Sequence, residues 1–339
     1  MKGWKGRRRN GKQTVRRLPT WELDEGVPVV RPDRCDVLVS ASVGPAGDLV
    51  ALWSTGQDEA ALRSVTTQPG WASFPDPTAA RPVAARVSRQ AGNIADVTPL
   101  TGLTVAHPLV QPLPQGRVLV VGARCRWRAD GPDRNAVVYD SDGHVEARAT
   151  LGDGIEHVFT TTSGEVWVGY FDEGVYGNYG WGDAAPPMGN SGLVRFSPQL
   201  EPAWRFPSHV DNEWDAIDDC YALNVTDDAV WTCYYSDFPI VQIRGDSVTG
   251  WRNQVTGARA LVLSGTRVGL LGGYGPDRDR FVVGELAGQA MRVVGEYRLV
   301  LPGGGPLPAH VTVIGRGAVL HVVTADYWYQ LSVDGVPGQ

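Results

Sequence analysis

The stretch DGIEHVFTTTSGEVWVGYFDEGVYG, residues 153–177, followed by GLVRFSP, residues 192–198, decides the fold. Ser163-Gly164 is typical of a tight turn, and residues 165–168 alternate polar and apolar side chains as a half-buried strand does. A strand-like run lies on each side of the turn, and a third run follows the Gly-rich segment. The stretch therefore predicts consecutive antiparallel strands of one sheet.

The same unit recurs along the chain. Six apolar runs follow turns, and their first apolar residues are separated by 69, 48, 64, 38 and 51 residues. These anchor residues are Leu49, Val118, Val166, Val230, Val268 and Val319. Further runs before and after each anchor give four strands in most units; in the first unit we expect ALRSVTT (61–67) and PVAARVS (82–88) as the third and fourth strands. Four strands per 40–60 residues are typical of propeller blades.

Six anchors predict an all-β, six-bladed β-propeller with few helices, because no long window repeats apolar residues at helical spacing. The last unit ends near Val333 without a fourth strand, whereas the N-terminus offers an extra run, TVRRLPTWEL (14–23). An N-terminal strand that completes the final blade would close the ring and remove two open sheet edges. We therefore expect one propeller domain over residues 14–336. A β-sandwich and two stacked barrels are alternatives that do not account for the repeated unit as well.

The unit at residues 153–206 resembles the propeller repeats of streptogramin lyases, NHL proteins and two-component-regulator sensors. Those repeats share a Gly-x-hydrophobic-Trp-hydrophobic strand after an inner strand, as GEVWVGY does here. The resemblance implies the propeller fold far more than an activity. The lyases use a histidine with a metal-held substrate, so a related site is one implication.

Charge is unevenly distributed. Residues 1–17 hold eight Lys and Arg and no acid; removing these eight from the total of 31 leaves 23 basic against 37 acidic residues, a balance of −14. We expect residues 1–13 to be a disordered basic tail that could contact anions, and the acidic body argues against a dedicated nucleic-acid domain. No apolar run typical of a secretory signal follows the basic tail, no apolar run is long enough to span a membrane, and the four cysteines lack CxxC spacing. We therefore expect a cytoplasmic protein with free thiols.

The topology predicts which residues share a face. We call the side where each inner strand begins the mouth face; it also receives the connections between the second and third strands. The loops 124–134 and 172–190 and the acidic run 211–219 all belong to it. A fixed offset of nine residues before each anchor predicts a ring that lines the channel: Ser40, Leu109, His157, Tyr221, Arg259 and His310.

Two kinds of chemistry are possible on this face. Asp218 and Asp219, within the acidic run, could hold Ca²⁺ or Mg²⁺; zinc is disfavoured because no His or Cys pair has ligand spacing. His157, Tyr221, Arg259 and His310 are candidate catalytic residues, with His157 as a general base. Strand alternation argues against a joint action of Glu156 and His157. Nucleophile-elbow, dinucleotide and P-loop motifs are absent from the sequence.

Aromatic residues among carboxylates favour recognition of a cationic, sugar-like or peptide partner. The candidate contacts lie in and beside the 172–190 loop: Asp172, Glu173, Tyr176, Tyr179, Trp181 and Trp214. The loop is either a recognition arm or an Ω-loop packed on itself. We favour a recognition propeller that binds a small molecule or peptide-like partner at the mouth face; the alternative is a lyase or lactonase-like hydrolase with a carboxylate-held divalent ion. The sequence leaves the ligand, any catalysis, the metal and the oligomeric state open.

Overall fold

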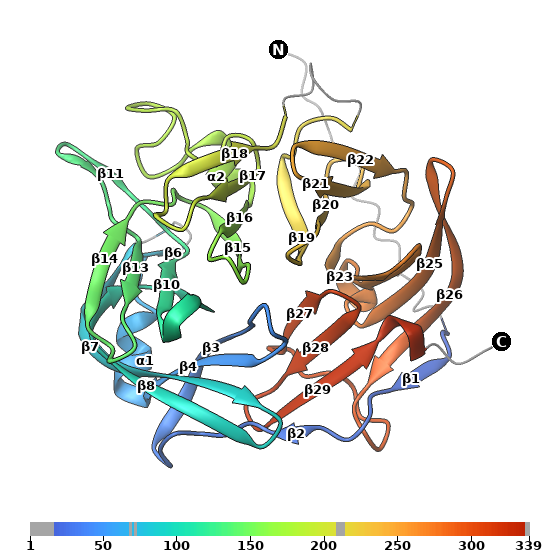
Figure 1. Cartoon of the computed structure of the whole chain (residues 1–339), viewed down its shortest axis with the longest axis horizontal. Helices are drawn as coiled ribbons and strands as arrows, with labels where there is room; N and C mark the ends of the chain where they lie inside the picture. Colours follow the sequence, from blue (N-terminus) through green and yellow to red (C-terminus); the bar gives the residue numbers. More distant parts are fainter. Residues whose placement is uncertain (1–16, 68–69, 71–72, 208–213, 336–339) are drawn as a thin grey trace.

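Six blade sheets, five of four strands and one of five, surround a central channel in the computed structural model, which describes residues 17–67, 70, 73–207 and 214–335 (Figure 1). Within each blade the strands follow one another in the chain and pair antiparallel, with the first strand innermost. Blades one to three consist of β3 (Asp36–Val43), β4 (Leu49–Thr55), β7 (Thr78–Ala91), β8 (Ile94–Val105); β9 (Pro108–Pro112), β10 (Val118–Gly122), β13 (Ala136–Tyr139), β14 (Val145–Ala149); β15 (Ile155–Thr160), β16 (Val166–Tyr170), β17 (Leu193–Phe196) and β18 (Pro202–Arg205).

The second half of the ring repeats this order. Blades four to six consist of β19 (Asp219–Val225), β20 (Val230–Tyr235), β21 (Ile240–Arg244), β22 (Ser247–Trp251); β23 (Ala258–Ser264), β24 (Arg267–Gly272), β25 (Arg280–Ala287), β26 (Ala290–Val300); β27 (Thr312–Arg316), β28 (Val319–Val323) and β29 (Tyr327–Ser332). Each inner strand contacts the inner strands of both neighbouring blades, and β27 contacts β3. The ring is therefore closed, and the predicted six-bladed propeller is confirmed.

The second strand of a blade packs on both neighbouring blades, which explains its unbroken apolar sequence. In β16, Trp167 joins a core cluster with blade four, whereas Val166 and Val168 join a cluster with blade two. All five residues of β16 are buried. Gly169 is required because a Cβ there would lie 2.7 Å from the sulfur of Cys220 in blade four. The Gly-x-hydrophobic-Trp-hydrophobic pattern thus results from close packing of this strand against both neighbouring blades, two and four.

The N-terminal segment closes the ring, but the strand that completes blade six is not the run predicted at residues 14–23. The short strand β1 (Thr20–Glu22) pairs parallel with β26 as a fifth strand of blade five, and β2 (Val27–Pro28) pairs antiparallel with β29 and completes blade six. Trp21 explains the difference, because its buried ring packs edge-on against two aromatic rings of blade five, those of Phe281 and Tyr297. Residues 14–16 and the predicted disordered tail, 1–13, lie outside the described residues.

A buried glutamine fastens this N-terminal segment to blade one. Gln90 of β7 accepts a hydrogen bond from the backbone N–H of Val30 and donates one to the carbonyl of Pro28, both at 2.8 Å. Its side chain is fully buried. The segment therefore joins blades five, six and one.

Blade one departs from its predicted strands. Residues 56–62 form helix α1 (Gly56–Leu62), and residues 65–67 form strand β5 (Val65–Thr67) of a small hairpin with β6 (Ser73–Pro75). The third and fourth strands are β7 and β8 instead. The hydroxyl of Thr55 caps α1 by accepting a hydrogen bond from the backbone N–H of Asp58. A helix of seven residues, about two turns, gives too short a pattern for periodicity to detect, and it lengthens the unit to the 69-residue spacing.

The remaining short elements are connections. They are β11 (Trp127–Arg128), β12 (Gly131–Pro132), α2 (Asp172–Tyr176) and the 3-10 turns η1 (Pro114–Gly116), η2 (Gly275–Asp277) and η3 (Val333–Gly335). In the described part of the chain, no helix has the length and apolar character needed to cross a bilayer. The cysteines described, Cys35, Cys125, Cys220 and Cys233, are all free thiols, and only Cys35 is exposed.

Candidate functional site

Three adjoining cavities run from the mouth face into the channel. The outer cup, of about 310 Å³, is lined by Asp172, Tyr176, Asp218, Asp219, Tyr221 and Tyr235. The middle pocket, of about 330 Å³, shares Asp219 and Tyr221 with the cup and adds Glu156, Phe171, Cys220, Gly257, Arg259, Gly273 and Tyr274. The channel cavity, of about 260 Å³, shares Glu156 and Arg259 with the middle pocket and is lined by residues of all six inner strands.

Inner strands of the blades at this site are bulged where they begin. In blade three the pairing with the second strand shifts by one residue between Ile155 and His157, which leaves Glu156 as the extra residue. Blade five shows the same shift around Arg259, and blade four shows it between Asp219 and Ala222. Blade one has a corresponding shift, whereas blades two and six have none. A bulge breaks strand alternation and redirects a side chain.

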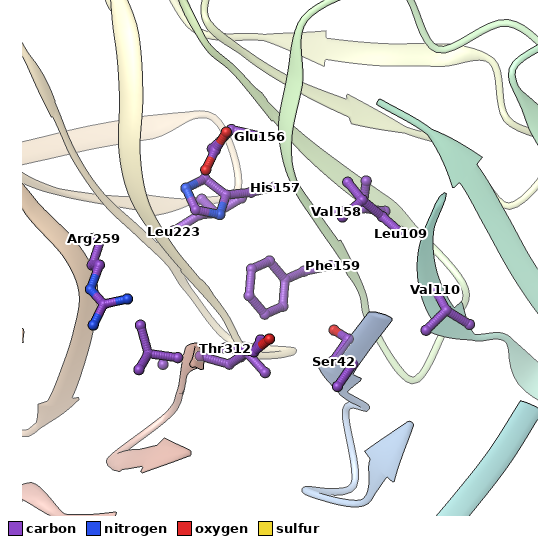
Figure 2. Close-up of a pocket in the computed structure, with 14 residues that line it drawn as sticks. Ser42, Leu109, Val110, Glu156, His157, Val158, Phe159, Leu223, Arg259 and Thr312 are labelled. Atoms are coloured by element: carbon purple, nitrogen blue, oxygen red, sulfur yellow. The ribbon is translucent and has the colours of Figure 1, made fainter. Parts of the chain in front are cut away.

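The bulges correct two sequence expectations. Glu156 and His157 both line the channel cavity, although strict alternation would separate them (Figure 2). The fixed nine-residue offset also fails: Leu109, His157 and Arg259 line the channel cavity, but Ser40, Tyr221 and His310 do not. Tyr221 lies instead at the boundary of the cup and the middle pocket. Figure 2 shows Arg259 and His157 pointing into the same space from different strands.

His157 makes a structural contact. Its Nε2 lies 3.2 Å from the backbone carbonyl oxygen of Tyr221, so this nitrogen carries the proton and donates it across the interface between blades three and four. In that tautomer, only Nδ1 could accept a proton. His310 is exposed and precedes β27. The four candidate catalytic residues are therefore not brought together at one point.

Carboxylates gather around the outer cup without a cationic partner. Asp172, Asp218 and Asp219 line it, and Glu156 stands just below. In residues 17–67, 70, 73–207 and 214–335, none of these four forms an ion pair. Burial, followed by the charges of Asp172 and Glu156, raises the pKa of Asp219 to about 6. Burial and the neighbouring like charges both disfavour the ionised form of Asp219, and a bound cation would favour it.

Tyrosines form the rest of the cup wall. The Tyr176 hydroxyl donates a hydrogen bond to Asp218, which raises the pKa of Tyr176 to about 12. The Tyr274 hydroxyl donates to the Tyr221 hydroxyl at 3.0 Å, and Tyr221 also packs edge-on against Phe238. The rings of Tyr176, Tyr235 and Tyr274 are 66%, 46% and 50% exposed, so aromatic surface is available to a ligand.

The 172–190 loop begins on a buried ion cluster. Arg124 is bidentate to Asp153, with both N–O distances at 2.9 Å, and its guanidinium lies 2.6 Å from Glu173 of α2. Burial alone would lower the pKa of Arg124, but the hydrogen bonds and charges of Asp153 and Glu173 outweigh it and raise that pKa. Burial also raises the pKa of Asp153, against the opposing effect of Arg124. The cluster fixes α2, and hence Asp172 and Tyr176, beside the channel mouth.

Beyond α2 the loop packs on the protein. Trp181 is buried, donates a hydrogen bond from Nε1 to the Cys125 carbonyl at 2.9 Å, and stacks edge-on against Trp127. Tyr179 lies over Arg124 and Arg126 and donates from its hydroxyl to the Pro75 carbonyl. These contacts favour the self-packed alternative for this part of the loop.

Trp214 also serves the core rather than the cavity. It packs against the core cluster of blades three and four and covers Gly250, where a Cβ would lie 2.4 Å from the indole. Of the six predicted binding residues, Asp172 and Tyr176 line the cup, and Glu173 supports it from below. The sequence prediction passed over Tyr274, although it comes just after the second strand of its blade, as Phe171 does, and Tyr235 ends the second strand of its own blade.

The predicted metal site is not prearranged. Within the described part of the chain, no three His, Cys, Asp or Glu side chains are grouped so that they could hold a metal ion. Residues 211–213 of the acidic run lie outside that part. A Ca²⁺ or Mg²⁺ ion at Asp218 and Asp219 stays a prediction.

Comparison with known proteins adds little beyond the fold. Residues 208–262 match the YxzG family, a match that covers blade four, the start of blade five and well under half of the chain. A search of curated proteins found no relative of this chain.

Several solved structures are similar at low identity. The extracellular domain of BT4673 from B. thetaiotaomicron, assigned to a one-component system, is 9% identical, with a TM-score of 0.45 over 94% of this chain and 44% of that one. The Cps50 (Swd1) β-propeller domain of Myceliophteria thermophila is 8% identical, with a TM-score of 0.46 over 88% and 87% of the two chains. A Bacteroides uniformis protein assigned as a 6-phosphogluconolactonase is 13% identical, with a TM-score of 0.43 over 86% and 80%. This chain thus spans under half the length of the BT4673 chain, and these similarities concern the fold alone.

Proposed function

We propose that this chain is a recognition propeller that binds a small molecule or peptide-like partner through a positively charged group in the outer cup. One observation carries the proposal: Asp172, Asp218 and Asp219 line a cavity with three tyrosines, and no cation of the described residues pairs with these carboxylates. An ammonium or guanidinium group would supply the missing charge.

The energetics support this ligand class. Two opposite charges 4 Å apart attract by about 4 kcal/mol near a protein surface, before desolvation is subtracted. A cation over a tyrosine face adds about 0.5–2 kcal/mol. A bound cation would also offset the like charges of Asp172 and Glu156, which add to burial in raising the pKa of Asp219. Neutral sugars gain none of these terms, so a cationic group is preferred to a sugar-like one.

The alternative is a lyase or lactonase-like hydrolase with His157 as general base and a carboxylate-held divalent ion. No contact in the site favours it over binding, because Nε2 of His157 donates to the Tyr221 carbonyl. It makes a distinct prediction: His157→Ala would abolish turnover of a lactone panel while a bound ligand is retained.

Thermal-shift and calorimetric titration test the binding proposal. The probes are putrescine and tetramethylammonium, with 1,4-butanediol and neopentyl alcohol as their uncharged counterparts. We expect only the cations to raise the melting temperature, with an effect that weakens as salt increases.

The test variant is Asp219→Asn, and its matched control is Asp228→Asn, which makes the same charge change at the opposite end of blade four. Asp219→Asn should abolish the shift and Asp228→Asn should keep it. Equal effects of the cations and their neutral counterparts, or of the two variants, would refute the proposal.

A further inference from the structure

Opposite charges line the middle pocket without pairing with each other. Arg259 of β23 lines it together with Glu156 and Asp219. Within the described part of the chain, neither carboxylate lies within ion-pair distance of the guanidinium, and Arg259 donates no hydrogen bond. Its Nε is buried with no acceptor. The nearest acidic influence is Asp279, which is itself paired with Arg278 at 3.4 Å.

An unpaired, partly buried guanidinium is costly unless an anion binds it. A guanidinium presents a planar fork that matches a carboxylate with two parallel hydrogen bonds. Burial lowers the pKa of Arg259, and the charge of Asp279 offsets this effect only in part. The bulge in β23 holds this side chain where the middle pocket meets the channel cavity, and Figure 2 shows it pointing into the open space.

The pocket therefore offers one binding position of each sign. Asp219 stands on the side of the outer cup, Arg259 stands on the side of the channel, and Glu156 lines both the middle pocket and the channel cavity. Phe171, Tyr221 and Tyr274 supply aromatic surface between these positions. The ligand that satisfies all three features carries an ammonium and a carboxylate in one small molecule, with an apolar part that lies on the rings.

We propose that the ligand is a zwitterionic amino acid, bound by its carboxylate to Arg259 and by its ammonium to Asp219 and Glu156, with its side chain against the tyrosines. This inference rests on the proposed function for the ammonium half and adds the carboxylate half. The cavity, at about 330 Å³, lies within the range of small-molecule sites. An amino acid bridges the two charged positions that the protein leaves unpaired.

Three matched probes distinguish recognition of the carboxylate from recognition of the ammonium. They are L-phenylalanine, 2-phenylethylamine, which lacks the carboxylate, and 3-phenylpropanoate, which lacks the ammonium. The other common amino acids are titrated beside them, so that side-chain preference does not hide binding. We expect at least one amino acid to bind ten-fold or more tighter than its decarboxylated amine, measured by calorimetry at low salt.

Arg259→Gln should lower the affinity for that amino acid to the level of its amine and leave the affinity for the amine unchanged. Arg259→Lys, which keeps the charge and loses the fork, should give an intermediate affinity. The control is Arg292→Gln, an exposed arginine on the outer strand of the same blade, which should bind as the wild type does. Because Arg259 has no partner to lose, Arg259→Gln should melt no lower than the wild type, whereas a structural arginine would lower the melting temperature.

The outcomes distinguish this inference from the proposed function. If the amine binds and no amino acid binds more tightly, or if Arg259→Gln weakens both equally, the zwitterion is wrong and cation recognition stands. If neither amines nor amino acids bind, both proposals fall. If the amino acid binds and Asp219→Asn weakens it together with the amine, both are supported.

Discussion

Replacement of Arg124 by methionine tests whether the buried ion cluster holds the mouth face together. Arg124 and Asp153 are each at least 95% buried, and the carboxylate accepts two hydrogen bonds from the guanidinium and one, at 2.7 Å, from the Cys125 backbone. Arg124→Met keeps most of the apolar volume and leaves Asp153 without a counterion. Removal of one partner from a buried ion pair costs about 3–5 kcal/mol.

The size of the expected melting shift follows from chain length. Unfolding entropy is about 2.1 cal/mol/K per residue, or about 0.7 kcal/mol/K for 339 residues. A loss of 3–5 kcal/mol therefore lowers the melting temperature by about 4–7 °C, measured by calorimetry at pH 7. Glu173 is partly exposed and can be hydrated, so most of the loss comes from Asp153.

The loss of stability caused by Arg124→Met should depend on pH. Without Arg124, burial raises the pKa of Asp153 further above its unfolded value of about 3.9, so the folded variant binds a proton more readily than the unfolded one. Stability of the variant then falls as pH rises from about 4 towards the folded pKa, and the deficit against wild type is smaller at pH 5 than at pH 7.

Two further variants act as controls for Arg124→Met. Arg128→Met breaks a half-exposed pair with Asp133 in the same loop and should cost at most about 1 kcal/mol. Arg124→Met combined with Asp153→Asn removes the uncompensated charge and should recover more than half of the loss. A single variant that melts within 1 °C of wild type, or a double variant that melts no higher than the single one, would refute the reasoning.

Three other predictions concern stability. Trp21→Ala should lower the melting temperature by about 4–7 °C, since burial losses of this kind cost about 3–5 kcal/mol; truncation of residues 1–16 leaves β1 and β2 in place and should change it by less than about 1 °C, and equal effects would contradict the closure. Asp219→Asn should stabilise the protein at pH 7 by about 1 kcal/mol after allowance for solvent screening. The reason is that the raised folded pKa of Asp219, about 6, makes the stability of the wild type fall as pH rises from about 4 through 6. A gain in stability that persists undiminished at pH 4 would contradict the raised pKa of Asp219. Trp181→Ala should destabilise the protein by about 3–5 kcal/mol and Tyr176→Phe by less than about 1 kcal/mol, measured by thermal melts. A larger loss for Tyr176→Phe than for Trp181→Ala would mean that Tyr176, rather than Trp181, holds the loop on the protein.

The blade pattern was predictable because it depends on local alternation and on packing that both neighbours impose. Trp167 and its flanking valines are buried on two sides, so their strand has an unmistakable apolar run. The closing strand was not predictable from the same signal. β2 has only two residues, one of them Pro28 on a sheet edge, which no propensity marks as a strand. The prediction chose the longer run at residues 14–23. Of that run only Thr20–Glu22 pairs with a strand, and it does so in blade five rather than blade six.

The cavities lie at the mouth face, where the sequence analysis placed the candidate residues, but only part of the predicted ring lines the channel cavity. A ring at a fixed offset assumes regular pairing from the anchor to the mouth, and a one-residue bulge shifts every residue beyond it. In β19 the bulge places Cys220 and Tyr221 opposite a single residue, so Tyr221 leaves the channel and joins the cup. His310 fails for a different reason, because β27 begins only at Thr312.

Two charged residues of the site, Glu156 and Arg259, lie in bulges of the inner strands. In a regular inner strand, successive side chains point to opposite faces. An added residue interrupts that alternation, and Glu156 and Arg259 are the added residues of their strands. Both line the middle pocket and the channel cavity, one with each sign of charge. Blades two and six, which pair regularly, contribute Leu109, Val110, Thr312, Val313, Ile314 and Gly315 to the channel cavity and no charge. The irregular pairing of two inner strands therefore contributes one residue of each charge to the channel mouth, and the connections after the second strands contribute Phe171, Asp172, Tyr176 and Tyr274.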